Sequence, residues 1–308
     1  EIGFTCSGSS DYLAGAPFSF VTAIDALGAW PPISESHVEK DAAWALYEAW
    51  VKIQHGAADS ALVYGFGKSS SSEIRDVLSL QLDPYYVAPL WPDSISLAAL
   101  QARALLESSR YSEKDLAEVA VRSRRNARSN PNAQLAGDAD PAALLAEPYF
   151  VSPLRKHDCP PISDGAAAVV LAAGDLARRI CQRPAWIRGI DHRIEPHSLG
   201  VRDLTRSPST ELAAAKAGVQ QGPIDLAELH APFTHQELIL RDALGLRDDV
   251  ELNPSGGALA ANPIMVAGLT RIGEAASRIS AGSAQRAVAH ATSGPCLQQN
   301  LVCVLEGE

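Results

Sequence analysis

A run of small residues near the C-terminus carries the strongest chemical signal of the chain. It spans residues 253–268, contains Gly256 and Gly257 in a Ser-Gly-Gly turn, and leads into a helical pattern over residues 269–279. Two adjacent glycines let the backbone approach a ligand or another backbone where a Cβ atom would clash. The N-terminus of the following helix offers amide hydrogens to a developing negative charge. The segment therefore predicts a site that holds an anion.

Two histidines and an asparagine could handle protons and oxygen atoms. His230 stands in the stretch Glu-Leu-His-Ala-Pro-Phe, and His290 lies between a short apolar run and Thr-Ser-Gly. Imidazole can polarise a carbonyl oxygen or carry a proton, because its pKa lies near the working pH. The amide of Asn262 cannot transfer protons at neutral pH, but it can donate hydrogen bonds to an enolate oxygen. The alternative at each histidine is a structural role, in the core for His230 and at a strand end for His290.

The composition is that of a large α/β protein and excludes several classes of function. The 308 residues, 46% of them hydrophobic, can fill two domain cores. A net charge of -10 argues against a nucleic acid or an anionic membrane surface as the main partner. No apolar run approaches the roughly 20 residues that a membrane span requires. The cysteines, 5 in number, lack metal-type spacing, so we expect free thiols in a cytoplasmic protein and no metal site.

An internal repeat indicates the architecture. Residues 48–61 align without gaps on residues 274–287, and both copies share glutamate, isoleucine, glycine and alanine at the same steps. Each copy has the pattern of a helix that ends at glycine, followed by a turn and a short apolar strand. Chance similarity between two alanine-rich helices is the alternative. The shared order of elements favours a duplicated unit and hence two similar halves.

The two halves are expected to meet near residue 180, giving domains 1–180 and 181–308. Residues 69–153 of the first half are rich in turn signals and include two amphipathic helix patterns, over residues 95–106 and 113–127. This region therefore has the character of a loop insertion.

A continuous apolar run over residues 164–172 is typical of a strand that is covered on both faces. Another strand pattern, over residues 184–190, opens the second half. Glu1 is an unnatural start that lies beside a strand-like segment, so we expect natural residues to precede it.

At three places the chain resembles the thiolase superfamily, and within it the branch of sterol-carrier-protein and lipid-transfer-protein-like thiolases. Asn253-Pro-Ser-Gly-Gly is similar to the Asn-x-x-Gly-Gly motif of that family. Ile162-Ser-Asp-Gly-Ala-Ala resembles its Ser-Asp-Gly-Ala-Ala strand entry, and Glu228-Leu-His-Ala-Pro-Phe resembles its Glu-x-His-Asp-x-Phe motif. The resemblance implies a five-layer αβαβα sandwich of two similar halves. It also implies that the first strand and helix of the fold would precede Glu1.

The resemblance fails at the nucleophile of the family. Thiolases place a reactive cysteine at the N-terminus of a buried helix, where the helix dipole favours the thiolate. The aligned stretch here is Val38 to Ala45, and Glu39 occupies the place of the cysteine. Glu39 could act as a base, or it could be an ordinary acidic residue favoured by a helix N-terminus. The departure argues against covalent acyl transfer at this position.

Other site residues follow from the resemblance. His230 replaces an asparagine, as in the sterol-carrier branch, and would face the thioester oxygen of an acyl-CoA. His290 aligns with the second, acid/base cysteine of many thiolases, and Asn262 stands for an active-site histidine. The amides expected to hold oxygen, and the arginines of an Arg-rich helix that could bind the nucleotide end of CoA, are Gly256, Gly257, Ser293, Gly294, Arg122 and Arg125. A solvated helix face is the alternative for the arginines.

This combination predicts carbon–carbon cleavage without an acyl-enzyme, most economically the retro-aldol cleavage of a β-hydroxyacyl-CoA in lipid or steroid side-chain degradation. CoA thioester would be a substrate, and no cofactor is expected. Two alternatives stay open: a noncatalytic subunit that supports an active partner, and thiolysis by a displaced nucleophile, Cys159 or Cys296. The resemblance implies a homodimer or a heteromer with another thiolase-like subunit or a small OB-fold acyl-CoA-binding protein.

Overall fold

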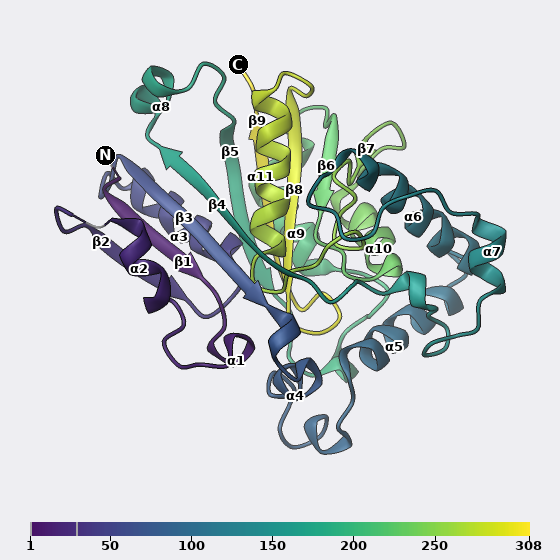
Figure 1. Cartoon of the computed structure of the whole chain (residues 1–308). Coiled ribbons are helices and arrows are strands. Elements are labelled where there is room, and N and C mark those ends of the chain that lie inside the picture. The colour runs from purple at the N-terminus through teal and green to yellow at the C-terminus, as the bar shows by residue number, and fades with distance from the viewer. Residues whose placement is uncertain (1, 29) are drawn as a thin grey trace.

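The computed structural model describes residues 2–28 and 30–308, which form two β-sheets and the helices that cover them (Figure 1). The first sheet has the strand order β2-β1-β3-β4. Its members are β1 (Phe4–Gly8), β2 (Ser34–Val38), β3 (Ser60–Lys68) and β4 (Asp164–Ala172). Strand β1 pairs in parallel with β2 and β3, whereas β4 pairs antiparallel with β3 along its whole length.

The second sheet has the strand order β5-β9-β8-β6-β7. Its members are β5 (Trp186–Ile194), β6 (Leu226–Leu229), β7 (Glu251–Leu252), β8 (Arg286–Ser293) and β9 (Gln299–Glu306). Strand β6 pairs in parallel with β7 and β8, and β9 pairs antiparallel with β5 and β8. The carboxyl end of β6 lies beside His290 in the second half of β8, so the residue that follows β6 comes next to the end of β8.

Two helices, α3 (Ala42–Gln54) and α11 (Ala267–Ser280), form the layer between the sheets. Apolar side chains of both helices and both sheets make one core, in which the small side chains of Ala42, Ala45 and Ala275 allow close approach. At Gly8 the backbones approach closely, because a Cβ atom there would lie 2.5 Å from the Cα atom of Ala42. Glycine at this position therefore lets the N-terminus of α3 lie against β1.

Helices α9 (Pro208–Ala217) and α10 (Thr234–Leu244) belong to the outer layer on the second sheet. Helices α5 (Ser94–Glu107), α6 (Glu113–Asn126) and α7 (Pro141–Ala146) lie on the same side of the molecule (Figure 1). Helices α5 and α6 contact α10, and α7 packs against α6. The helices predicted over residues 95–106 and 113–127 are therefore confirmed as α5 and α6. Both contribute to the core of the second half, so the inserted region is packed structure.

The remaining helices are short and lie at the periphery. They are α1 (Asp11–Ala14), α2 (Val21–Leu27), α4 (Ile74–Ser79) and α8 (Gly174–Ile180). The boundary expected near residue 180 falls at the end of α8, between the last strand of one sheet and the first strand of the other. No helix in the described ranges is long and apolar enough to cross a membrane.

The two copies of the repeat occupy equivalent places in the two halves. Residues 48–61 contain the end of α3 and the start of β3, and residues 274–287 contain the end of α11 and the start of β8. Each copy therefore carries its chain from the central helix layer into the middle of a sheet. The predicted order of helix, turn and strand is confirmed for both copies.

One expectation about the first sheet is wrong. Residues 164–172 do form a strand, β4, but side chains along it alternate between exposed and half-buried positions. Ala166, Ala168 and Val170 are exposed, since β4 lies at the edge of the sheet and only its other face contacts the central core. An alanine-rich strand is apolar on both faces whether or not both are covered, which is why the pattern misled.

Candidate active site

A cavity of about 370 Å³ lies where the inserted region meets the loops of the two halves. It receives residues from α4, the start of α5, the loop before β4, the loop after β6, the loop before α11, and the turn between β8 and β9. Most of the lining is apolar, including Ile74, Leu78, Leu82, Ile95, Leu97, Ile162, Phe233, Ile264 and Leu297. Buried polar side chains, of which Asp41, His230 and Asn262 are the principal ones, also line the cavity. An apolar chamber with a few convergent polar groups is typical of a small-molecule site.

His230 directly follows β6, and both nitrogens of its ring make hydrogen bonds. The backbone N–H of Thr292 donates to Nδ1 at 3.3 Å. We therefore assign the ring proton to Nε2, which lies 3.1 Å from Oδ1 of Asn262 and donates to it. Burial, with a smaller contribution from the positive charge of Arg271, lowers the pKa of His230 to about 4. The imidazole is therefore neutral near pH 7 and acts on its surroundings mainly as a donor to Asn262.

Asn262 lies in the cavity wall and is held at its backbone N–H and at its side-chain oxygen. Its backbone N–H donates to Oγ of Ser163 at 3.0 Å, and its side-chain oxygen accepts from His230. Within residues 2–28 and 30–308, its side-chain nitrogen Nδ2 has no hydrogen-bond partner. Because the oxygen faces the donor on His230, the amide hydrogens are available to an oxygen atom of a ligand. The structure thus brings together two of the residues that the sequence singled out.

Asp41 is a third polar group of the cavity, and we did not single it out from the sequence. It is the N-cap of α3, and its side chain accepts from the amide of Ala43 at 2.8 Å. It also accepts from the first turn of α11, from the amides of Gly268 at 2.8 Å and Leu269 at 3.1 Å. One carboxylate therefore caps both central helices. An aspartate before an alanine-rich helical run is an N-cap signal, so half of this role was visible in the sequence.

The expectation of free amides at the start of α11 is corrected by this arrangement. Asp41 takes two of them, and the amide of Thr270 donates to the backbone oxygen of Val266 at 2.9 Å. A negative charge already occupies this helix N-terminus, as the macrodipole favours. An external anion would have to displace it.

The glycine pair of the anion-site prediction lies outside the cavity lining. The amide of Gly256 donates to the backbone oxygen of Asn253 at 2.8 Å, and that of Gly257 donates to Oγ of Ser255 at 3.2 Å. Both glycines have positive φ angles, and a Cβ atom on Gly256 would lie 2.7 Å from the Cβ atom of Ala127. The pair therefore serves a turn that packs closely against the inserted region.

Glu39 and the two arginines also lie away from the cavity lining. Glu39 is exposed, accepts from the amide of Asp11 at 2.8 Å and lies 3.6 Å from the ring of His37. Arg122 forms an ion pair with the buried Glu237, which in turn accepts from the side chain of Asn253. Arg125 is exposed. In this structure Arg122 supports the loop that contains the glycine pair.

His290 is fully buried in β8 and does not line the cavity. Its Nε2 atom lies 3.0 Å from Oδ1 of Asn300, and burial lowers the pKa of the imidazole to about 3. The side-chain nitrogen of Asn300 donates to Ser209 Oγ and to the backbone oxygen of Leu297, both at 2.7 Å. His290 thus belongs to a network behind the cavity wall.

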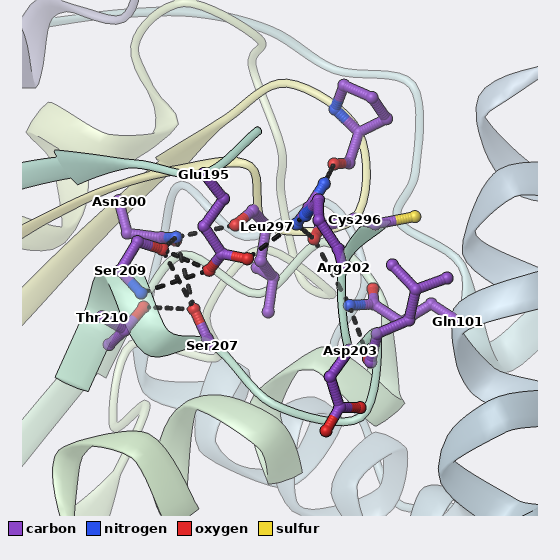
Figure 2. A network of polar contacts seen from close by, with 12 residues as sticks. Gln101, Glu195, Arg202, Asp203, Ser207, Ser209, Thr210, Cys296, Leu297 and Asn300 are labelled. Atoms are coloured by element: carbon purple, nitrogen blue, oxygen red, sulfur yellow. Dashed lines mark hydrogen bonds and ion pairs between the residues drawn. The ribbon is translucent and has the colours of Figure 1, made fainter. Parts of the chain in front are cut away.

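The hydrogen bonds of Asn300 hold the turn between β8 and β9 (Figure 2). Of the predicted residues, Ser293 is the last of β8 and Gly294 lies in the turn, and both line the cavity. Cys296 and Leu297 have φ angles of 54° and 58°, a backbone conformation that residues other than glycine rarely adopt. Arg202 donates to the backbone oxygens of Pro295 and Cys296 and pairs with Glu195 at 3.2 Å. The buried ion pair therefore fixes an uncommon backbone conformation at the cavity wall.

Burial affects both thiols that were considered as displaced nucleophiles. It raises the pKa of Cys296, which lines the cavity, to about 11, and that of Cys159, which does not, to about 12. The thiolate is the nucleophilic form, and little of it is present near neutral pH at such values. Neither thiol is therefore activated in this structure.

Comparison with solved structures identifies the class of fold. The chain matches an Ltp2-ChsH2(DUF35) aldolase with a TM-score of 0.79 and 18% identity, over 99% of this chain and 86% of that one. It matches the acetyl-CoA acetyltransferase of Bacillus anthracis with a TM-score of 0.77 and 16% identity, over 100% of this chain and 88% of that one. The protein therefore has the thiolase fold.

The sequence relatives agree. An acetyl-CoA acetyltransferase of Methanothermobacter thermautotrophicus is 30% identical over 222 residues, which cover 65% of this chain and 58% of that protein. Sterol carrier protein 2 of Gallus gallus is 24% identical over 292 residues, which cover 80% of this chain and 53% of that protein. The chain thus spans little more than half the length of these two relatives, and no family model matches it. The resemblance to the thiolase superfamily, and to its sterol-carrier branch, is confirmed.

Proposed function

We propose that this thiolase-like protein is a carbon–carbon lyase that cleaves a β-hydroxyacyl-CoA by a retro-aldol reaction without a covalent intermediate. The observation that carries the proposal is the pair of His230 and Asn262 at the cavity. A neutral imidazole holds the amide oxygen, and the amide hydrogens remain for a ligand. Such a donor stabilises a thioester enolate, the intermediate of an aldol cleavage.

In the proposed reaction a base takes the proton of the β-hydroxyl group, and the bond between Cα and Cβ breaks. The former hydroxyl carbon leaves as a ketone or aldehyde, and the electron pair of the broken bond moves into the thioester as an enolate. Asn262 donates a hydrogen bond to the enolate oxygen while Cα accepts a proton. One such donor contributes roughly 100-fold to 1000-fold to the rate in acyl-transfer enzymes.

The walls of the cavity favour a hydrophobic acyl group. Apolar side chains from the inserted region and from both halves surround most of the space, so a hydrocarbon group would lose its contact with water there. Lipid or steroid side-chain CoA esters, the substrate class that we expected from the sequence, have this character. The similarity in fold to an enzyme that is named an aldolase gives further support.

We also propose a partner. The Ltp2-ChsH2(DUF35) aldolase combines a thiolase-like chain with a DUF35 protein. A small acyl-CoA-binding subunit of that type, or a second thiolase-like chain, would serve the present protein in the same manner. CoA thioester then acts as the substrate, with no separate cofactor.

The test compares two substrates. The chain is incubated alone and with a DUF35-type partner, first with a steroid side-chain β-hydroxyacyl-CoA and then with a β-ketoacyl-CoA plus free CoA, and products are followed by mass spectrometry. We expect the first substrate to give a carbonyl compound and a shortened acyl-CoA, and the second to give no thiolysis. Asn262→Ala should lower kcat by about 100-fold to 1000-fold, whereas the exposed Asn132→Ala serves as a control. Thiolysis without aldol cleavage, or full activity in Asn262→Ala, would refute the proposal.

A further inference from the structure

The proposed cleavage needs a proton acceptor, and His230 is poorly placed to be one. Its Nδ1 atom accepts from the backbone of Thr292, and its Nε2 atom faces an acceptor, so neither nitrogen has a free lone pair in this arrangement. The ionisable side chains that line the cavity are Asp41, Arg75, Asp93, His230 and Cys296. An arginine stays protonated in proteins, and Cys296 donates its thiol to the backbone oxygen of Leu97 at 3.4 Å. Two carboxylates remain.

The backbone next to Asp41 contacts the loop that contains Asn262. The amide of Ala42, the next residue, donates to the backbone oxygen of Met265 at 2.8 Å, and Met265 follows Asn262 by three residues in the cavity wall. Asp93 instead belongs to the inserted region, where it caps α5 by accepting from the amide of Ser96. The position of Asp41 therefore suits a reaction whose enolate oxygen is held by Asn262.

The carboxylate of Asp41 has capacity for one more proton donor. An ionised carboxylate offers about four acceptor positions on its two oxygens. The amides of Ala43 and Leu269 fill two positions on Oδ1, and the amide of Gly268 fills one on Oδ2. The residue is 3% exposed, so bulk water competes little for the fourth position. The remaining acceptor site on Oδ2 belongs to a group that lines the cavity.

We infer that Asp41 is the catalytic base of this site, a role that rests on the proposed lyase function. Oδ2 takes the proton of the β-hydroxyl group as the bond between Cα and Cβ breaks and the carbonyl product forms. The carboxylic acid then returns a proton to Cα of the enolate, so that Asp41 ends each cycle ionised. No further reactant is required.

The environment of Asp41 agrees with this role. Burial raises the pKa of its carboxyl group, while the amides of Ala43, Gly268 and Leu269 and the charge of Lys40 oppose the rise only in part. A carboxylate with a raised pKa binds a proton more readily, as a base working near neutral pH must. The two central helices also fix the side chain, so little reorganisation would accompany the transfer.

A purely structural role as a double helix cap is the competing explanation, and two variants separate the two. Asparagine and serine are both good N-caps, but neither can accept a proton at neutral pH. Asp41→Asn and Asp41→Ser should therefore fold, with a moderate loss of thermal stability, and kcat should fall by at least about 100-fold. Asp158→Asn is the matched control. That buried carboxylate also accepts from a backbone amide, of Arg155 at 2.7 Å, but it does not line the cavity.

A second measurement follows the base without the cleavage step. In D₂O, the wild-type chain with its partner should exchange a Cα proton of the saturated acyl-CoA product, because the same base forms the enolate in the reverse direction. We expect this exchange to be lost in Asp41→Asn and Asp41→Ser and kept in Asp158→Asn. Exchange that persists in either folded Asp41 variant would overturn the role of Asp41 and leave the lyase function standing. A wild-type chain that neither exchanges nor cleaves would overturn both.

Discussion

Two buried histidine–asparagine pairs lie close together in this protein and differ in one respect. In the cavity pair, His230 contacts Asn262 at 3.1 Å, and in the rear pair, His290 contacts Asn300 at 3.0 Å. The side-chain nitrogen of Asn300 is used fully, by Ser207, Ser209 and the backbone of Leu297. That of Asn262 is not used by any residue of the described parts of the chain. The same two residue types therefore build a ligand site in one place and a structural network in the other.

The largest effect on stability is expected when the contacts of Arg202 with the turn between β8 and β9 are removed. Arg202→Ala would leave the buried Glu195 without its charged partner, with hydrogen bonds from Ser209 alone, and would remove two hydrogen bonds to the turn, so the free energy of unfolding should fall by about 3–5 kcal/mol. Arg206→Ala, which breaks the exposed pair with Glu211, should lower it by less than about 1 kcal/mol. Urea unfolding of both variants measures the difference. Equal effects would show that the turn does not depend on the buried pair.

The second prediction uses pH, because burial lowers the pKa of both histidines. The folded values are about 4 for His230 and about 3 for His290, below the unfolded value of 6.5. The unfolded chain therefore binds protons first as the pH falls, and native stability decreases below pH 6.5. Each histidine should account for a loss of about 2 kcal/mol between pH 6.5 and 5.

The check is the pH dependence of urea unfolding in His230→Gln and His290→Gln. In each variant the free energy of unfolding should decrease less between pH 6.5 and 5, by the contribution of the histidine that was replaced. A slope that either variant leaves unchanged would mean that the corresponding imidazole is already charged, or is exposed to water, in the folded protein.

The comparison also shows what the sequence can and cannot reveal. The order of helix, turn and strand in the repeat, the inserted helices and the choice of His230 and Asn262 as site residues all rest on local patterns and on motifs of the family, and these were predictable. The shared cap at Asp41 was not, because its second helix begins more than 200 residues later and only the fold brings the two N-termini together. The different fates of Asn262 and Asn300 depend on neighbours from other segments, which no local pattern contains.

The third prediction compares the two asparagines directly. Asn300→Ala would leave His290 Nε2 and the backbone oxygen of Leu297 without buried partners, so the free energy of unfolding should fall by about 1–3 kcal/mol. Asn262→Ala removes one hydrogen bond, because Nδ2 of Asn262 has no partner among the described residues, and its effect on unfolding should be smaller. Asn300→Ala should therefore be the less stable variant, and Asn262→Ala should be the less active one. If Asn262→Ala were the less stable variant, the distinction between the pairs would be lost.

The smallest effect concerns thiol labelling. It tests whether the turn between β8 and β9 keeps Cys296 buried. Cys296 lines the cavity, and Arg202 donates to its backbone oxygen. Because burial raises the pKa of its thiol to about 11, only about one thiol in 10,000 is ionised at pH 7, whereas Cys181 is exposed. Iodoacetamide at pH 7 should therefore label Cys181 and leave activity unchanged.

Mass spectrometry of wild type and Arg202→Ala makes the test specific: labelling of Cys296 should appear when Arg202 is removed. Rapid labelling of Cys296 in the wild type would mean that the turn opens without the loss of its support, and would restore this thiol as a candidate nucleophile.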